Sequence, residues 1–357
     1  MSATPLGAEI AALVRETGPI GIDRYMALCL GHPVHGYYRT RDPLGARGDF
    51  TTAPEISQMF GELIGIWIAS VWGLMGAPGP LRLVELGPGR GTLMADALRA
   101  LRAVAPNARI DLHLVETSAV LRVAQGAALA GAGPTWHAEP DAVPPGPAIW
   151  IANEFFDCLP VRQFVRTPRG WCERVVGLAG DALAFGLAPE PTAAITAEAP
   201  DGAVMTLPAP ALDLMRALAR RLRDRGGALL AIDYGHVRPG FGDTLQAVAG
   251  HRFVGPLEAP GEADLTAHVD FSALGRAACA EGVTLHGPVD QRAFLNALGL
   301  SERSQRLKTR ATPDRAAAID AAAQRLTDPA PRGMGSLFKA MGLGAPDLPP
   351  LPGFPNA

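Results

Sequence analysis

The sequence has few lysines, few cysteines and little net charge, and each shortage argues against a class of protein. Lysine occurs only at positions 308 and 339, and the formal net charge is −3, so nothing in the charge favours nucleic acid as the main partner. The four cysteines are scattered and form no Cys-x-x-Cys pair, so we expect no structural zinc and no other metal. We interpret the abundance of arginine, alanine, glycine and proline as genomic composition.

The chain also lacks a long apolar run. Residues 1–15 do not combine a basic stretch with an apolar one, so we expect no secretory signal. The most apolar helix candidate, residues 64–74, is too short to span a bilayer. We therefore expect a cytoplasmic protein. With 357 residues, 48% of them hydrophobic, the chain can build one large domain or two modest ones.

One stretch, residues 81–92, organises the rest of the chain. It has the sequence Leu-Arg-Leu-Val-Glu-Leu-Gly-Pro-Gly-Arg-Gly-Thr, which predicts a short strand, a glycine turn and the start of a helix. Gly87, Gly89 and Gly91 let the backbone turn sharply and let a ligand approach without meeting Cβ atoms. The helix directs its free N–H groups and the positive end of its dipole at that ligand.

The acidic residue before the turn separates two classes of ligand. A dinucleotide site would follow G-x-G-x-x-G, but the third glycine position is occupied by Thr92. A pyrophosphate would be repelled by Glu85, whereas a ligand's ammonium group would pair with it. The pattern Glu-x-Gly-x-Gly-x-Gly resembles motif I of the class I S-adenosylmethionine (SAM)-dependent methyltransferases. The alternative is an ordinary glycine turn between a strand and a helix.

The remaining apolar segments predict an α/β fold. Further strands are expected at 109–116, 134–137, 148–153, 228–234 and 283–286, with helices between most of them. This alternation favours a doubly wound, Rossmann-like sheet with helices on both faces. Helices at 8–72, including one capped at Thr52 or Ala53 that runs through Trp72, and at 290–326 are additional to the sheet. We expect them to form a cap over the strand ends.

This pattern divides the chain into five expected segments. They are an N-terminal helical cap and lid loop (1–77), a methyltransferase core (78–289) with an antiparallel hairpin near 161–187, inserted helices (290–330), a final core strand (331–345) and a poorly ordered, proline-rich tail (346–357).

Polar residues at the strand ends complete the predicted cofactor site. Glu116 lies at the C-terminal end of the strand expected at 109–116, and ligands of open α/β sheets bind at the carboxyl ends of strands, where its carboxylate can accept both hydroxyls of a ribose. A nicotinamide site also uses an acidic residue here, so Glu116 alone does not discriminate. The expected cofactor-binding residues are Thr51, Glu85, Gly87, Pro88, Gly89, Gly91, Thr92, Glu116, Thr117, Ser118 and Asn153.

The residues after the fourth strand are candidates for binding the methyl acceptor. Glu154 and Asp157 frame two phenylalanines, a set suited to a guanidinium, because carboxylates pair with its fork and aromatic rings stack on its plane. Holding the charge on one nitrogen leaves another with a freer lone pair, so we assign Glu154 and Asp157 as catalytic. The alternative is that the carboxylates cap a helix and the rings are core. Further substrate-binding candidates are Asp49, Phe155, Phe156, His236 and His268.

Several stretches together resemble the MidA family, bacterial relatives of the mitochondrial complex I assembly methyltransferase. They are residues 48–62, 85–93, 153–157, 232–236, 263–271 and 333–339, so the resemblance covers roughly residues 18–339. It implies a class I methyltransferase fold with added helices, SAM as methyl donor and S-adenosylhomocysteine as product. From the mitochondrial member it implies symmetric dimethylation of an arginine in a complex I subunit. One departure is Cys158, where alanine is expected.

Two other functions fit the same residues. One is a non-catalytic assembly factor that keeps a SAM pocket, and the other is a methyltransferase that acts on a small molecule. The sequence leaves open the methyl acceptor, the number of methyl groups and the oligomeric state.

Overall fold

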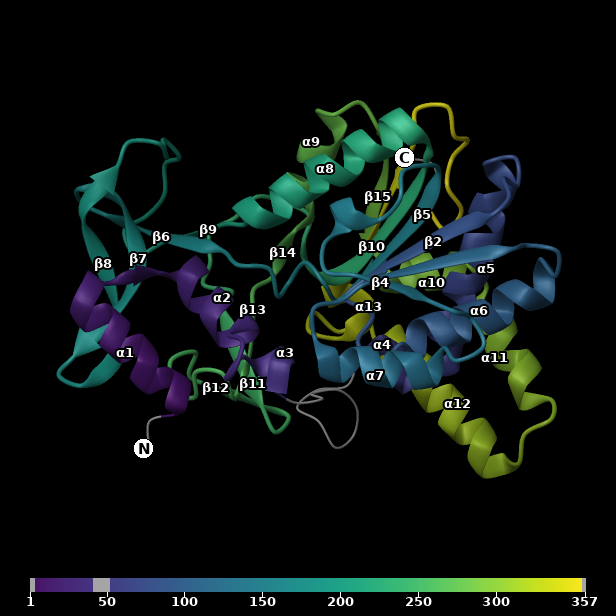
Figure 1. Ribbon diagram of the computed structural model, residues 1–357, viewed down its shortest axis with the longest axis horizontal. Helices are drawn as coiled ribbons and strands as arrows, with labels where there is room; N and C mark the ends of the chain where they lie inside the picture. The colour runs from purple at the N-terminus through teal and green to yellow at the C-terminus, as the bar shows by residue number, and fades with distance from the viewer. Residues whose placement is uncertain (1–3, 41–51, 355–357) are drawn as a thin grey trace. The chain divides into compact units, whose positions relative to one another are not determined.

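The computed structural model describes residues 4–40 and 52–354 (Figure 1). The chain divides into two compact units, each assembled from three stretches of sequence. Unit 1 comprises Met1–Phe50, Asp157–Leu214 and Arg238–Asp270, and unit 2 comprises Thr51–Phe156, Met215–Val237 and Phe271–Ala357. Segment 1–77 of the sequence-based division is therefore shared between the two units.

Unit 2 contains a mostly parallel sheet with the strand order β15-β16-β10-β5-β2-β3-β4 (Figure 1). Its strands are β2 (Leu81–Leu86), β3 (Ile110–Val115), β4 (Thr135–His137), β5 (Ala148–Asn153), β10 (Gly227–His236), β15 (Thr284–Asp290) and β16 (Phe338–Gly344). The strands from β10 to β4 pair in parallel, whereas β16 is antiparallel to both of its neighbours. The predicted α/β sheet is confirmed.

Helices cover both faces of this sheet, as alternate residues of β5 show. Ile149 and Ile151 are buried in one core cluster with residues of α5 and α6, while Trp150 faces the guanidinium of Arg221 on α8, 5.0 Å from its ring centroid. The helices are α4 (Ala53–Ile56), α5 (Gln58–Leu74), α6 (Thr92–Val104), α7 (Ala119–Ala128), α8 (Ala209–Arg225, which crosses the unit boundary), α9 (Phe271–Cys279), α10 (Gln291–Ala297), α11 (Leu300–Lys308), α12 (Pro313–Leu326) and α13 (Met334–Leu337), with a 3-10 turn at Pro140–Ala142.

The helix expected to run unbroken from residue 53 to Trp72 is two helices. Ser57 has an extended backbone (φ −161°, ψ 137°), and its hydroxyl accepts a hydrogen bond from the N–H of Met59. Serine competes with helical hydrogen bonding in this way, so it ends α4 and caps α5. Thr52 occupies the N-cap position of α4.

The last part of the chain differs from the expectation in two further places. Residues Met334–Leu337 form a helical turn, so the final strand begins only at Phe338. The proline-rich tail is packed over its described part, because Leu351 and Phe354 are buried in the main core cluster and Trp67 donates a hydrogen bond to the carbonyl of Pro352. Prolines lose little backbone entropy on folding, so two apolar side chains are enough to fix the segment.

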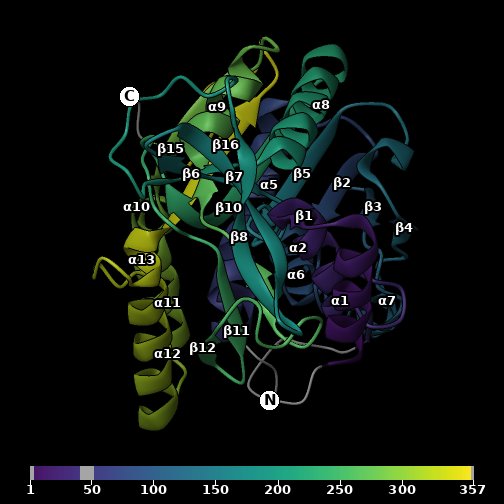
Figure 2. The same cartoon turned by 90° about the vertical axis from the view of Figure 1, so that its left-hand side faces the viewer.

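Unit 1 is built on antiparallel sheets. In one sheet the order is β1-β7-β6-β9 with β8 also paired to β7, and in the other it is β12-β11-β13. Helices α1 and α2 pack against β7 (Figure 2). The elements of this unit are α1 (Pro5–Thr17), β1 (Ile20–Gly21), α2 (Ile22–Gly31), α3 (Tyr37–Thr40), β6 (Arg162–Thr167), β7 (Gly170–Ala179), β8 (Ala182–Thr192), β9 (Val204–Leu207), β11 (Gln246–Ala249), β12 (Arg252–Val254), β13 (Asp264–Thr266) and β14 (Val269–Asp270).

The described residues contain neither a membrane-spanning helix nor a cluster of metal ligands. Within 4–40 and 52–354, none of the helices is both long and apolar enough to cross a membrane. Over the same ranges, no group of three or more histidine, cysteine, aspartate or glutamate side chains is placed to hold a metal ion.

Candidate functional site

The strand order of unit 2 reverses between β2 and β5. From β2 the chain proceeds outward through β3 and β4, and from β5 it proceeds the other way to β10. Such a switch point opens a crevice beyond the carboxyl ends of the two strands, where ligands bind in open α/β sheets. The glycine turn follows β2, and Asn153 ends β5, so both predicted segments flank this switch point.

The glycine turn has a backbone that other residues rarely adopt. Gly87, Gly89 and Gly91 have φ angles of 58°, 54° and 83°. A Cβ added to Gly87 would lie 2.8 Å from Cδ2 of Phe155, so the turn also leaves no room for a side chain there. Gly91 caps α6, whose first residue, Thr92, donates a 2.6 Å hydrogen bond to Glu55.

Glu85 is a buried carboxyl group with an unused oxygen. It is 3% exposed on β2, and its Oε2 has no hydrogen-bond partner among the residues that the structure describes. Burial raises the pKa of Glu85 to about 8. A buried carboxyl without a cation is costly, so a positively charged ligand group beside it would stabilise the ionised form.

Glu116 lies at the end of β3 with both oxygens already hydrogen-bonded. Oε1 accepts from the N–H of Ser118 at 2.7 Å, and Oε2 accepts from Nε2 of Gln125 at 3.1 Å. Burial raises the pKa of Glu116, and these two hydrogen bonds partly offset the effect. A carboxylate has about four acceptor positions, so it can still accept ligand hydroxyls. Ser118 also caps α7, whereas Thr117 is exposed.

The residue after β5 has an unusual backbone. Glu154 has φ 50°, uncommon for a residue with a side chain and typical of functional sites. Its N–H donates to the carbonyl of Ile232, and its Oε1 accepts from the N–H of Ala53 and from Nδ2 of Asn153, each at 3.1 Å. The Oδ1 of Asn153 is buried and has no hydrogen-bond partner within residues 4–40 and 52–354. Two polar groups are therefore held at the end of β5.

A buried aspartate on β10 fixes the loop that follows. Oδ2 of Asp233 accepts from the N–H groups of Phe155 and Phe156 at 3.1 and 2.9 Å, and Oδ1 accepts from the N–H of Tyr234. Asp233 is fully buried. The two phenylalanine rings contact each other edge to face, with centroids 5.5 Å apart.

Asp157 belongs to unit 1, whereas Glu154 belongs to unit 2. Asp157 is buried, and its carbonyl accepts from the N–H of Ala267. Within unit 1, Tyr38 donates a 2.8 Å hydrogen bond to Asp264, and burial, followed by the charges of Asp264, Cys158 and Asp157, raises the pKa of Tyr38. Acidic groups therefore gather around Tyr38. That Glu154 and Asp157 hold one guanidinium together stays a prediction.

The other predicted substrate residues lie in several places. His236 is half-buried at the end of β10 in unit 2, and His268 is half-buried between β13 and β14 in unit 1. Thr51 and Asp49 lie outside the described residues. Their roles stay predictions.

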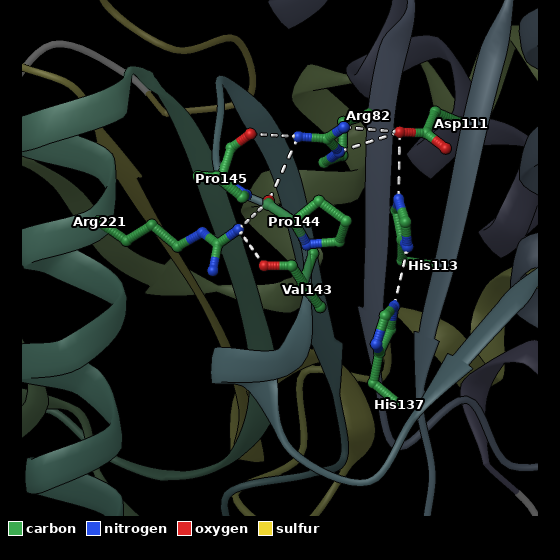
Figure 3. A network of polar contacts seen from close by, with 8 residues as sticks. All are labelled: Arg82, Asp111, His113, His137, Val143, Pro144, Pro145 and Arg221. Atoms are coloured by element: carbon green, nitrogen blue, oxygen red, sulfur yellow. Dashed lines mark hydrogen bonds and ion pairs between the residues drawn. The ribbon is translucent and has the colours of Figure 1, made fainter.

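A polar network braces the side of the sheet formed by β2, β3 and β4 (Figure 3). Arg82 donates to Oδ2 of Asp111, which lies 3.1 Å from Nε2 of His113, and Nδ1 of His113 lies 2.9 Å from Nε2 of His137. Burial would raise the pKa of Asp111, but His113 and Arg82 outweigh it and lower the pKa. The backbone carbonyl of His137 accepts a hydrogen bond from the N–H of Glu116. The network therefore also supports the predicted ribose-binding residue.

The same network fixes the loop before β5. Guanidinium groups of Arg82 and Arg221 donate to the backbone carbonyls of Val143, Pro144 and Pro145 (Figure 3). These arginine contacts join the loop to the amino end of β2. The predicted site lies at the opposite, carboxyl ends of the strands.

Two residues near the predicted site did not emerge from the sequence. Asp233 stands in a motif of the family resemblance, but only the structure shows that it fixes a loop from the preceding strand. Gln125 lies four residues after Leu121, on the buried face of α7. A polar residue at a core position needs hydrogen-bond partners, so this position is the signal that could have identified Gln125.

The sheet, its switch point, the glycine turn and Glu85 define a class I SAM-dependent methyltransferase. Residues 63–289 match the family model described as "Putative S-adenosyl-L-methionine-dependent methyltransferase". The chain belongs to this family, and the resemblance to MidA proteins is confirmed.

Relatives and solved structures agree with the family. The chain is 41% identical over 331 residues to the mitochondrial protein arginine methyltransferase NDUFAF7 of Mus musculus, covering 84% of this chain and 75% of the relative. The homologue of Drosophila melanogaster is 36% identical, covering 94% and 84%. A COG1565 superfamily structure from Burkholderia thailandensis with bound S-adenosyl-homocysteine is 30% identical, with a TM-score of 0.83, and covers 99% of this chain and 93% of that one.

The chain is thus a SAM-dependent methyltransferase, and the prediction of SAM as cofactor is confirmed. Its own residues fit that molecule. The unused buried oxygen of Glu85 suits an ammonium group, and the turn at Gly87 offers a surface without Cβ atoms. Glu116 keeps acceptor capacity for hydroxyls.

Proposed function

We propose that this enzyme transfers methyl groups to an arginine side chain of a protein. The observation that carries the proposal is the pair of polar residues at the end of β5, where Glu154 is held in an unusual backbone conformation beside Asn153. A carboxylate fixed at the switch point of the sheet suits a guanidinium, because the charged groups pair with two parallel hydrogen bonds. The mouse relative is named a protein arginine methyltransferase, and this supports the same substrate class.

The residues of unit 2 would hold the cofactor in a defined way. Glu85 would pair with the ammonium group of SAM, and the turn at Gly87–Gly91 would leave room for the amino-acid part of the ligand. Glu116 would accept hydrogen bonds from the ribose hydroxyls. Thr92, Thr117, Ser118 and Asn153 line the same strand ends and complete the proposed cofactor set, together with Pro88. Bound SAM supplies a methyl group on a sulfonium, which is open to attack by a nitrogen lone pair.

Glu154 and Asp157 would prepare the acceptor. Their carboxylates would bind the guanidinium and keep its positive charge on the nitrogens that they contact, so the remaining nitrogen has the freer lone pair. Phe155 and Phe156 would stack on the guanidinium plane. His236 and His268 are the proposed groups for proton handling.

A complex I subunit is the proposed protein substrate, and the cytoplasm is the proposed location. A non-catalytic assembly factor and a methyltransferase of small molecules are the competing functions. They differ in product, since only the proposed function yields methylated arginine in a protein.

The test compares extracts of a strain that lacks the protein. Purified enzyme and methyl-labelled SAM are added, and labelled proteins are identified by mass spectrometry. We expect methylarginine in one protein, at a level that falls at least about tenfold with Glu154→Gln, because that change removes a charged hydrogen-bond acceptor. Glu302→Gln, on the exposed surface of α11, is the matched control.

The outcomes separate the parts of the proposal. Binding of S-adenosylhomocysteine without any methylated protein would favour the assembly factor, and labelling confined to small molecules would favour the third function. Full activity of both Glu154→Gln and Asp157→Asn would refute the acceptor site but leave the cofactor site untouched.

A further inference from the structure

Gln125 contacts three segments that are distant in sequence and that the sheet brings together. It is fully buried on α7. Its Nε2 donates to the carbonyl of Gly89 at 2.7 Å and to Oε2 of Glu116 at 3.1 Å, and its Oε1 accepts from Nε1 of Trp136 at 2.8 Å. One side chain thereby joins the glycine turn after β2, the carboxylate after β3 and the strand β4.

The amide can adopt only one orientation. Its two N–H bonds meet two acceptors, a carbonyl and a carboxylate, and its oxygen meets the donor of an indole. A flipped amide would set oxygen against both acceptors and NH₂ against the indole N–H, and all three hydrogen bonds of this fully buried side chain would be lost. Gln125 is therefore fully matched to its surroundings.

The glycine turn and α7 are also in direct contact. A Cβ added to Gly91 would lie 3.5 Å from Cα of Gln125 and 3.6 Å from Cβ of Ala128. The turn therefore rests on the helix, and the amide of Gln125 fixes its carbonyl at the same place. Glu116 is held at Oε1 by the N–H of Ser118, so removal of Gln125 takes away the side-chain hydrogen bond at Oε2.

We infer that Gln125 is a positioning residue of the cofactor site, which keeps the glycine turn and the carboxylate of Glu116 at a fixed separation. The inference rests on the proposed roles of the turn and of Glu116 in binding the cofactor. Both segments would contact the same ligand molecule, so their separation must match its length. A ligand binds more weakly to a site that becomes ordered only on binding than to a site that is already ordered.

The first experiment measures the dissociation constant of S-adenosylhomocysteine by calorimetry. Gln125→Leu removes the amide but keeps much of the side-chain volume, and we expect binding about tenfold weaker or more, because a hydrogen bond to a charged group is lost. The matched control is Gln291→Leu. Gln291 is also fully buried in unit 2, and its Nε2 donates to the carbonyl of Leu326, away from the glycine turn. This control should lower the melting temperature but change the dissociation constant by less than about twofold.

A second variant keeps the test decisive if Gln125→Leu does not fold. Gln125→Glu places a carboxyl group between two acceptors. Protonated, this group donates one hydrogen bond. Ionised, it repels Glu116. The ratio of the variant's dissociation constant to that of the wild type should therefore rise with pH, whereas a residue that only fills space would give a constant ratio.

The results distinguish this inference from the proposed function. If the wild type does not bind S-adenosylhomocysteine, the cofactor site itself is wrong. If the wild type binds it and Gln125→Leu binds within about twofold, or the Gln125→Glu ratio stays constant from pH 5 to 9, only the role of Gln125 is overturned.

Discussion

Binding of a ligand ammonium group beside Glu85 should release a proton from this carboxyl group. The number of protons released follows from the pKa of Glu85. Burial raises the pKa of this carboxyl to about 8, so at pH 7 it is protonated in about nine tenths of the free molecules. Pairing with a ligand ammonium group lowers the pKa well below 7. Binding of S-adenosylhomocysteine at pH 7 should therefore release about 0.9 proton per site.

Calorimetry in two buffers measures this number. The observed binding enthalpy differs between phosphate and Tris by the number of protons released times the difference in buffer ionisation enthalpy. The affinity should also rise with pH, by up to about tenfold per unit below pH 8, because the carboxyl must ionise before it pairs. Two controls isolate Glu85: the variant Glu85→Gln and the ligand 5′-methylthioadenosine, which lacks the amino-acid part and its ammonium group. A proton release near zero for the wild type would refute the reasoning.

The same shift determines how stability depends on pH. The pKa of Glu85 is higher in the folded protein than its ordinary value of 4.5, so the folded state binds the proton more tightly than the unfolded chain. Its contribution to stability is fully present below pH 4.5 and is lost as the pH rises to about 8. The whole shift corresponds to about 5 kcal/mol. We expect the free energy of unfolding of Glu85→Gln, relative to that of the wild type, to be higher at pH 9 than at pH 6. Urea unfolding at the two pH values measures this difference.

Two further predictions concern the segments around the switch point. Gly87→Ala should lower stability by about 1 to 3 kcal/mol in urea unfolding and weaken S-adenosylhomocysteine binding, because the new Cβ meets Phe155. Gly76→Ala, also at positive φ but with open space around it, separates backbone strain from this clash. Asp233→Ala should cost at least about 2 kcal/mol, since the N–H groups of Phe155 and Phe156 lose their acceptor. Normal hydrogen-exchange protection of Phe156 in that variant would contradict this role.

The sheet could be predicted because its strands are continuous apolar runs. Segments such as Ala148–Asn153 are buried on both faces in a parallel sheet, so almost every residue is apolar, and the turn residues after them stand out. The helix break at Ser57 could not be predicted, because one serine within an apolar period is as compatible with a helix as with a cap. The packed tail was missed because its two core residues, Leu351 and Phe354, lie among prolines and show no period.

The candidate site also has a part that the sequence predicts and a part that only the structure shows. Glu85 and the glycines are adjacent in sequence, so their joint role is visible as a motif. The contacts of Gln125 with Gly89, and of Asp233 with Phe155, join residues separated by 36 and 78 positions. Only the folded sheet brings such pairs together, because each depends on which strands are neighbours. That Glu154 and Asp157 fall in different units was likewise hidden from a pentapeptide in which they are three residues apart.

The position of β16 has a consequence for the order of folding. This strand follows every other described strand in the sequence, yet it lies inside the sheet, antiparallel to β10 on one side and β15 on the other. While the chain is being synthesised, β10 therefore has an open edge and β15 has no partner until residues 338–344 have left the ribosome. Contacts of such long sequence separation form late, so the nascent protein must keep an unpaired strand edge from associating with other chains until β16 is available for pairing.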